Sequence, residues 1–300
     1  MSYHLPVLAK ECIEGLNIKP DGVYVDVTFG GGGHSRLIME QLSDKGQLYG
    51  FDQDEDAVAN QLPDDNFTFV AANFRHLYRF LRLHGVKQVD GILADLGVSS
   101  HQLDEGSRGF SFRFESELDM RMNQEDDLTA ADILNQRTSA ELQQIFGRYG
   151  EVRNAKTLAQ SIVRERVKSP FKNISDFLAF LEPLVRGQKH RYLAQVFQAL
   201  RIEVNDEMGA LDDFLADAKK VLKPNGRLVV ISYHSLEDRT VKKFFKTGNV
   251  NGEVIKDFYG NIERPFKIIT KKAMLPTEEE LKENSRSRSA KLRIGERLVD

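Results

Sequence analysis

The sequence contains a single cysteine, Cys12, and no tryptophan in 300 residues. One cysteine cannot form a disulfide within the chain or build a thiolate metal cluster. No apolar run approaches the roughly 18 residues that a membrane-spanning helix needs. The first residues, MSYHLPVLAKECIEG, lack a basic stretch followed by an apolar core, so they do not look like a secretory signal. We therefore expect a cytoplasmic protein with no membrane segment.

The charged residues and histidines restrict the possible partners. The seven histidines show no pair at helical ligand spacing with a partnering carboxylate, so we expect no metal site. The net charge of −3 hides an uneven distribution. From Arg148 to Arg201, 11 lysines and arginines face four acids, a net charge of +7 that leaves −10 for the rest of the chain. Local positive charge favours nucleic acid binding, although a solvated helical face explains it equally well.

The first hundred residues alternate between short apolar runs and helix-like segments. The apolar runs predict strands at Val23–Phe29, Gln47–Asp52, Phe67–Ala72 and Val89–Asp95. The segments between them predict helices at His34–Leu42, Asp54–Gln61 and Phe74–Leu83. This alternation is typical of βαβ units and a parallel sheet.

The alternation stops after residue 100 and returns near the C-terminus. Residues 101–127 predict a long ordered loop, and residues 129–217 show a helical pattern. Strand signals return at Arg227–Tyr233, Phe266–Lys272 and Ala290–Arg297. We predict one α/β domain over residues 1–104 and 213–300, interrupted by an all-helical domain over residues 105–212.

The first predicted strand runs into four consecutive glycines, at positions 30–33. Bare backbone between a first strand and a first helix lets a nucleotide approach closely. A P-loop is excluded because Gly33 is followed by His34 and not by lysine and a hydroxyl residue. The second strand ends in Asp52, 20 residues past Gly32, where an acid can accept hydrogen bonds from ribose hydroxyls. NAD and S-adenosylmethionine fit these features equally well.

Two further strand ends favour S-adenosylmethionine. Phe74 follows the third predicted strand, where an aromatic ring can lie against an adenine. Asp95 ends the fourth, and the carboxyl ends of parallel strands line one crevice. A carboxylate suits the neighbourhood of a positive sulfonium, whereas hydride transfer to a nicotinamide needs a His, Lys or Tyr partner. We therefore favour a methyltransferase over a nicotinamide-dependent oxidoreductase.

Seven longer strings are far more specific than a glycine cluster. In chain order they are HLPVLAKE (His4–Glu11), DVTFGGGGHS (Asp26–Ser35), DGILADLGVSSHQLD (Asp90–Asp104), RGFSF (Arg108–Phe112), LDMRM (Leu118–Met122), FQALRIEVNDE (Phe197–Glu207) and SYHSLEDR (Ser232–Arg239). Together they resemble the bacterial 16S ribosomal RNA cytosine N4-methyltransferases, and the resemblance covers nearly the whole chain.

The resemblance implies a class I, Rossmann-like methyltransferase sheet with an inserted all-helical domain. It implies methylation, with S-adenosylmethionine, of a cytosine N4 amine in the decoding region of 16S rRNA in the small ribosomal subunit. Carried over by position, the cofactor-binding residues are Gly32, Gly33, His34, Asp52, Phe74, Asp95 and Gln102. We expect RNA phosphates to contact the basic inserted domain, the run Arg239–Lys246 and the tail residues Arg286, Arg288, Lys291 and Arg293.

Asp95 is the candidate catalytic residue. The cytosine amine is a poor nucleophile because its lone pair is delocalised into the ring. Acceptors such as Asp95 and the Leu96 carbonyl can draw the nitrogen towards tetrahedral geometry and receive its proton. Asp95 holding the amino group of the cofactor is an equally good interpretation. The candidate substrate contacts are Tyr233, His234 and Ser235, at the end of the returning strand.

One departure from other amino-methyltransferases concerns the cytosine itself. Many carry Asp/Asn-Pro-Pro-aromatic after the fourth strand, whereas residues 95–98 here are Asp-Leu-Gly-Val. The ring that stacks on the cytosine must come from elsewhere, and the candidates are Tyr233, Phe110 and Phe112. The missing motif weighs against a DNA amino-methyltransferase. A non-catalytic ribosome-assembly factor is a further alternative, which the glycine loop, Asp52 and Asp95 argue against. The oligomeric state is not predicted.

Overall fold

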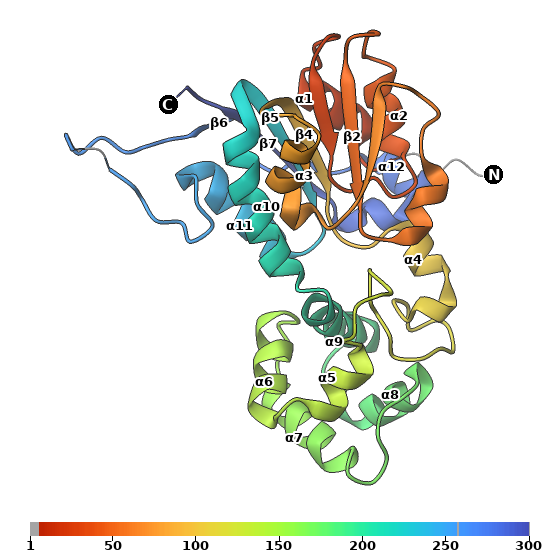
Figure 1. The fold of residues 1–300 in the computed structure, drawn as a ribbon. Coiled ribbons are helices and arrows are strands. Elements are labelled where there is room, and N and C mark those ends of the chain that lie inside the picture. Colours follow the sequence, from red (N-terminus) through yellow and green to blue (C-terminus); the bar gives the residue numbers. More distant parts are fainter. Residues whose placement is uncertain (1–5, 257, 300) are drawn as a thin grey trace. The chain divides into compact units, whose positions relative to one another are not determined.

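The computed structural model describes residues 6–256 and 258–299 (Figure 1). His4 and Leu5, which begin the first of the seven strings, lie outside the described residues. The chain divides into two compact units. Residues 1–97 and 209–300 form what we call the sheet unit, and residues 98–208 form the helical unit.

The sheet unit is built on a seven-stranded sheet with the order β3-β2-β1-β4-β5-β7-β6. Its strands are β1 (Val23–Asp26), β2 (Gln47–Asp52), β3 (Phe67–Ala71), β4 (Val89–Asp95), β5 (Leu222–Ser232), β6 (Phe266–Ile268) and β7 (Lys291–Arg297). The first five strands pair in parallel, and β7 runs antiparallel to both β5 and β6. This is the class I, Rossmann-like methyltransferase sheet that the sequence predicted.

Each predicted strand is present; β2 and β4 have the predicted bounds, and the others have at least one shifted end. β1 stops at Asp26 and not at Phe29, although the N–H groups of Val27 and Phe29 still donate to β4 and to Phe51 of β2, at 2.9 Å each. β5 begins earlier than predicted, at Leu222, and its pairing with β4 shifts register between Leu222 and Arg227. The polar Pro-Asn-Gly segment at 224–226 forms this irregularity.

Helices and short 3₁₀ turns connect the strands. They are α1 (Ala9–Leu16), α2 (Gly33–Met39), η1 (Glu55–Asn60), η2 (Phe74–His76), α3 (Leu77–Leu83), α10 (Glu207–Val221), α11 (Ser235–Thr247), α12 (Glu278–Glu283) and η5 (Ser285–Ser289). The predicted helix at Asp54–Gln61 is only a 3₁₀ turn, capped by the Asp54 side chain. Cys12 lies fully buried in the apolar core around α1.

The helical unit has its own apolar core, which includes Leu134, Phe146, Leu158 and Phe177. Its elements are α4 (Ser100–Asp104), η3 (Gly106–Arg108), α5 (Ala130–Gln136), α6 (Ser139–Arg148), α7 (Ala155–Glu165), α8 (Ile174–Leu181), η4 (Glu182–Leu184) and α9 (Lys189–Val204). Capping boxes at Thr129 and Thr138 start α5 and α6. The prediction of a loop over residues 101–127 missed α4 and η3.

The boundaries of the two units along the chain differ from the predicted ones. The helical unit begins at Val98 and not at residue 105, because Val98 and Leu103 pack against its core. The sheet unit resumes at Gly209, four residues before the predicted 213. Within the described residues, no helix is both long and apolar enough to cross a membrane.

Candidate active site at the carboxyl ends of the strands

Three carboxylates end neighbouring parallel strands of the sheet: Asp26 on β1, Asp52 on β2 and Asp95 on β4. In an open α/β sheet this edge is where ligands bind. The sequence singled out Asp52 and Asp95 for this reason and passed over Asp26. The loop of four glycines leaves the same edge between β1 and α2.

Asp52 fastens the glycine loop. Its Oδ2 accepts a hydrogen bond from the N–H of Gly30 at 2.8 Å, and its Oδ1 accepts one from the N–H of Asp54 at 2.9 Å. Burial raises the pKa of the carboxyl to about 6, while these two hydrogen bonds oppose the rise. A carboxylate has about four acceptor positions, so Asp52 keeps acceptor capacity for the ribose contact that remains its predicted role.

The glycines of the loop serve different purposes. Gly32 has φ +72, a conformation that other residues rarely adopt, and an added Cβ would lie 3.0 Å from the Phe29 ring. A Cβ on Gly33, the first residue of α2, would lie 3.3 Å from Pro6. At Gly31 a Cβ would meet no atom within 4 Å. The loop therefore needs Gly32 for its own shape and leaves open space at Gly31; cofactor contacts at Gly32 and Gly33 stay predictions.

Asp26 is a site residue that sequence reasoning missed. Its carboxylate is 1% exposed, accepts the Ser35 hydroxyl at 2.7 Å, and accepts the N–H of Thr28 at 3.1 Å. Burial raises its pKa. An acid inside the apolar run VYVDVTF was the signal that could have found it. Because Thr28 and Ser35 flank the four glycines, Asp26 holds the two ends of the loop together.

Asp95 is the centre of a hydrogen-bonded cluster. The Tyr233 hydroxyl donates to Asp95 Oδ1 at 2.8 Å, and the Asp95 N–H donates to Thr28 Oγ1 at 2.7 Å. Its Oδ2 lies 3.9 Å from Nδ1 of His34. Burial raises the pKa of Asp95 to about 6, and the nearby His34 and Tyr233 oppose the rise. The carboxyl is thus held in place and titrates close to neutral pH.

His34 is buried beside Asp95, and its ring is fixed by the backbone. Nε2 lies 2.9 Å from the Val7 carbonyl oxygen. A carbonyl only accepts, so Nε2 carries a proton and Nδ1 faces Asp95. This geometry gives His34 a positioning role within the loop and the Asp95 cluster. The contact of His34 with the cofactor stays a prediction.

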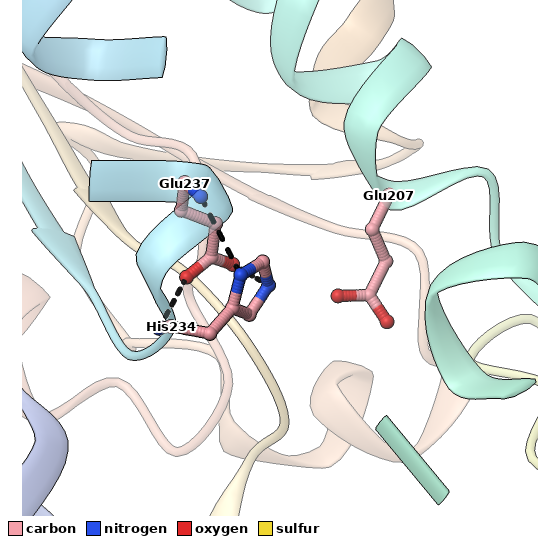
Figure 2. Close-up of side chains that lie close together, drawn as sticks. All are labelled: Glu207, His234 and Glu237. Carbon is pink, nitrogen blue, oxygen red and sulfur yellow. Dashed lines mark hydrogen bonds and ion pairs between the residues drawn. The ribbon is translucent and has the colours of Figure 1, made fainter. Parts of the chain in front are cut away.

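The predicted substrate contacts at 233–235 separate into two kinds. Tyr233 belongs to the Asp95 cluster, and burial and the negative Asp95 raise its pKa, which keeps the phenol protonated as a donor. His234 instead caps α11: its Nδ1 accepts from the N–H of Glu237, whose Oε2 accepts from the N–H groups of Tyr233 and His234 (Figure 2). Ser235 is the first residue of α11. The capping box thus accounts for His234 structurally.

Phe74 and Gln102 complete the predicted cofactor set. Phe74 is half-buried beyond the end of β3 and packs edge-on against Phe214 of α10, with ring centroids 5.5 Å apart. Contact with an adenine stays a prediction. Gln102 lies in the helical unit, where its Oε1 accepts from the N–H of Ser99 in a capping box that starts α4. It is therefore outside the group of residues that the sheet unit brings together.

Comparison with known proteins shows the family of the chain. The model of the MraW methylase family matches residues 1–298. Proteins named ribosomal RNA small subunit methyltransferase H are similar over nearly their whole length. That of Bacteroides thetaiotaomicron is 56% identical over 298 residues, which cover 99% of this chain and 98% of the relative. Those of Cytophaga hutchinsonii (56% identical, covering 98% and 99%) and Flavobacterium johnsoniae (54%, covering 99% of each) are similar to the same degree. The chain belongs to the MraW methylase family.

Proposed function

We propose that this protein transfers the methyl group of S-adenosylmethionine to the N4 amine of a cytosine in the decoding region of 16S rRNA. The observation that carries the proposal is the Asp95 cluster, in which the Tyr233 hydroxyl donates to a carboxylate of raised pKa and Thr28 accepts from the Asp95 backbone N–H beside the glycine loop. Full-length similarity to small-subunit rRNA methyltransferases supports the substrate class. The cytoplasm, where ribosomal subunits are found, is its proposed location.

The residues at the strand ends fit S-adenosylmethionine. The loop leaves open space where a Cβ at Gly31 would stand, and Asp52 keeps acceptor capacity beside it. When bound, S-adenosylmethionine supplies an electrophilic methyl group on a positively charged sulfur. In our proposal Asp52 binds the ribose, Phe74 lies against the adenine, and Gly32, Gly33 and His34 contact the methionine end. Gln102 is the contact proposed from the helical unit.

Asp95 performs the proton chemistry in this proposal. Asp95 Oδ2 and the Leu96 carbonyl would accept hydrogen bonds from the amine N–H groups as the nitrogen attacks the methyl carbon. The methyl–sulfur bond would break, S-adenosylhomocysteine would leave, and the carboxylate would take the proton that the methylated amine loses. The Tyr233 hydroxyl donates to Oδ1 and so orients the other oxygen. Alignment of this kind supplies a large part of the rate in a direct displacement.

Tyr233 is our choice for the ring that lies against the cytosine. It already contacts Asp95, whereas Phe110 is buried in the core of the helical unit and Phe112 packs on Phe197 there. Gly97, with φ +99, lies close to the Tyr233 ring, since an added Cβ would be 3.4 Å from it. A cytosine must be unpaired or flipped out of its helix to reach this pocket.

The helical unit is the proposed rRNA-recognition domain. Lys156 and Arg164 on α7, and Arg153 two residues before it, are exposed, while Leu158 and Ile162 are buried in the core. These basic side chains are therefore available to contact phosphates. Phosphate contacts of this kind position an RNA without reading its sequence.

Methyl transfer from labelled S-adenosylmethionine to small ribosomal subunits that lack the modification tests the function. We expect label in N4-methylcytidine after digestion to nucleosides. The Asp95→Asn variant is the matched control, and purified 16S rRNA and a deoxyoligonucleotide of the same sequence are alternative substrates. Label on another base contradicts the proposed acceptor, and label on the deoxyoligonucleotide alone favours the DNA amino-methyltransferase. Cofactor binding without any transfer favours the assembly factor.

A further inference from the structure

An arm of the sheet unit, described over residues 249–256 and 258–265, leaves the end of α11 and returns to β6 (Figure 1). Its outer part is closed by a β-bridge between Lys256 and Ile262 and by a 2.9 Å hydrogen bond from the N–H of Glu263 to the Ile255 carbonyl. At its base, the Asn249 side chain accepts from the N–H of Glu253 at 2.9 Å and donates to the Glu253 carbonyl at 2.8 Å. The bridge and the bond beside it join the two sides of the arm.

The tip of the arm presents two aromatic rings to solvent. Phe258 is 97% exposed and Tyr259 is 87% exposed, with ring centroids 5.6 Å apart and nearly perpendicular planes. Gly260 follows with φ +86, and an added Cβ there would meet no atom within 4 Å. Neither ring contributes to the core of the sheet unit. Two adjacent exposed rings at the tip of such an arm are typical of a binding surface.

The charge around the arm indicates what binds there. From Arg239 to Lys272 there are nine lysines and arginines against three acids, a net charge of +6. All nine basic side chains are exposed: Arg239, Lys242, Lys243, Lys246, Lys256, Arg264, Lys267, Lys271 and Lys272. The base of the arm lies against this surface, because a Cβ on Gly252 would be 3.4 Å from Lys243.

Aromatic rings at the tip of an arm whose base lies against a positively charged surface suit RNA better than a second copy of the chain. Two copies meeting here would bring two positive surfaces together, which repel each other. Unpaired RNA bases stack on aromatic side chains, while lysines and arginines contact the phosphates between them.

We propose that the arm binds an unpaired segment of the small-subunit rRNA, with Phe258 and Tyr259 each stacking on a base. The proposal rests on the proposed function for the identity of the RNA. It adds a contact that the basic helical unit and the loop of glycines do not supply. The arm therefore acts in substrate binding and not in methyl transfer.

The test compares Phe258→Ala, Tyr259→Ala and the double variant with the parent. The probes are 16S rRNA transcribed in vitro for the dissociation constant, and small ribosomal subunits for KM and kcat. We expect each single substitution to weaken RNA binding about tenfold and the double substitution to weaken it further. The kcat at saturating subunits, S-adenosylmethionine affinity and Tm should stay at parental values. Leu83→Ala, at an exposed apolar residue of α3, is the matched control.

Two further variants separate stacking from apolar docking. Phe258→Trp keeps an aromatic face and should retain RNA affinity, whereas Phe258→Leu keeps only apolar area and should lose it. Equal affinity for the Leu, Ala and parent proteins overturns the proposal. So does a change of oligomeric state in the double variant with RNA affinity unchanged, which would assign the arm to self-association. A parent protein that makes no N4-methylcytidine overturns the proposed function alone. The RNA dissociation constants of the variants still test the role of the arm in that case.

Discussion

Asp95 is held by Tyr233 on one oxygen and faces His34 with the other, and burial raises its pKa to about 6. Burial of this negative charge lowers the stability of the folded protein, whereas the proposed proton transfer needs a carboxylate at this position. An amide in its place keeps the acceptor for Tyr233 but cannot take a proton from an amine. Asp95→Asn therefore separates the two roles that the sequence left open.

Asp95→Asn should lower kcat for methyl transfer by about 10²–10⁴-fold, the usual contribution of a general base. S-adenosylmethionine affinity, measured by calorimetry, should change little. A fall in cofactor affinity as large as the fall in kcat/KM contradicts the proton-transfer role and assigns Asp95 to the amino group of the cofactor. Asp44→Asn, at an exposed acid of the same unit, is the control.

The pH dependence of kcat/KM should also show the ionisation of Asp95. In the proposed mechanism the ionised forms of Asp95 and Asp52 are the active ones, and the pKa of each is raised to about 6. The kcat/KM of the parent should therefore be flat above pH ~6 and fall below it with a limiting slope between about one and two. In Asp95→Asn the remaining activity should lose about one unit of that slope. An unchanged slope in Asp95→Asn means that another group ionises in this pH range.

The free energy of unfolding should fall as pH rises, whereas kcat/KM should rise. The pKa of Asp95 is about 6 when folded, against its ordinary value of 3.8, so the folded state binds more protons between these pH values and stability falls as pH rises through them. Above pH ~6 the full cost is present. We expect Asp95→Asn to be about 2–3 kcal/mol more stable than the parent at pH 8 and similar at pH 4, by urea unfolding. A variant less stable at pH 8 contradicts this.

At the scale of elements, the loop from β1 to α2 depends more on Gly32 than on Gly31. Gly32→Ala places a side chain at φ +72 and 3.0 Å from Phe29, so it should cost about 1–3 kcal/mol of stability and weaken cofactor binding. Gly31→Ala meets no atom within 4 Å and is the matched substitution, which should leave Tm nearly unchanged. Thermal unfolding of both variants checks this, and equal losses would contradict it.

The element that sequence reasoning placed least well is the segment after β4. Residues 101–127 lack a hydrophobic period, yet Ser99 and Gln102 start α4 through a capping box. A five-residue helix has too few positions to show a period. The cap at His234 was missed in the same way, although Glu237 three residues later was its signal. The substrate contact of His234 stays a prediction.

At the scale of the whole molecule, positive charge gathers in two places, on residues 148–201 of the helical unit and on residues 239–272 of the sheet unit. Both are proposed to contact phosphates. Affinity for 16S rRNA should therefore fall steeply and linearly with the logarithm of salt concentration, while S-adenosylmethionine affinity should fall much less. Titrations between about 50 and 200 mM salt measure this. RNA affinity independent of salt contradicts the phosphate contacts.

The sequence by itself determined the α/β class, the interruption by helices and the family, because apolar periodicity and the seven strings are local properties. Its assignment of the cofactor to the strand ends stays a prediction. Only the tertiary structure decided that Tyr233 joins Asp95, 138 positions away, that Asp26 closes the loop, and that Phe258 and Tyr259 stand exposed on an arm. Such facts depend on which strands become neighbours and which side chains the core leaves out. Contacts between distant residues leave no period in a single sequence.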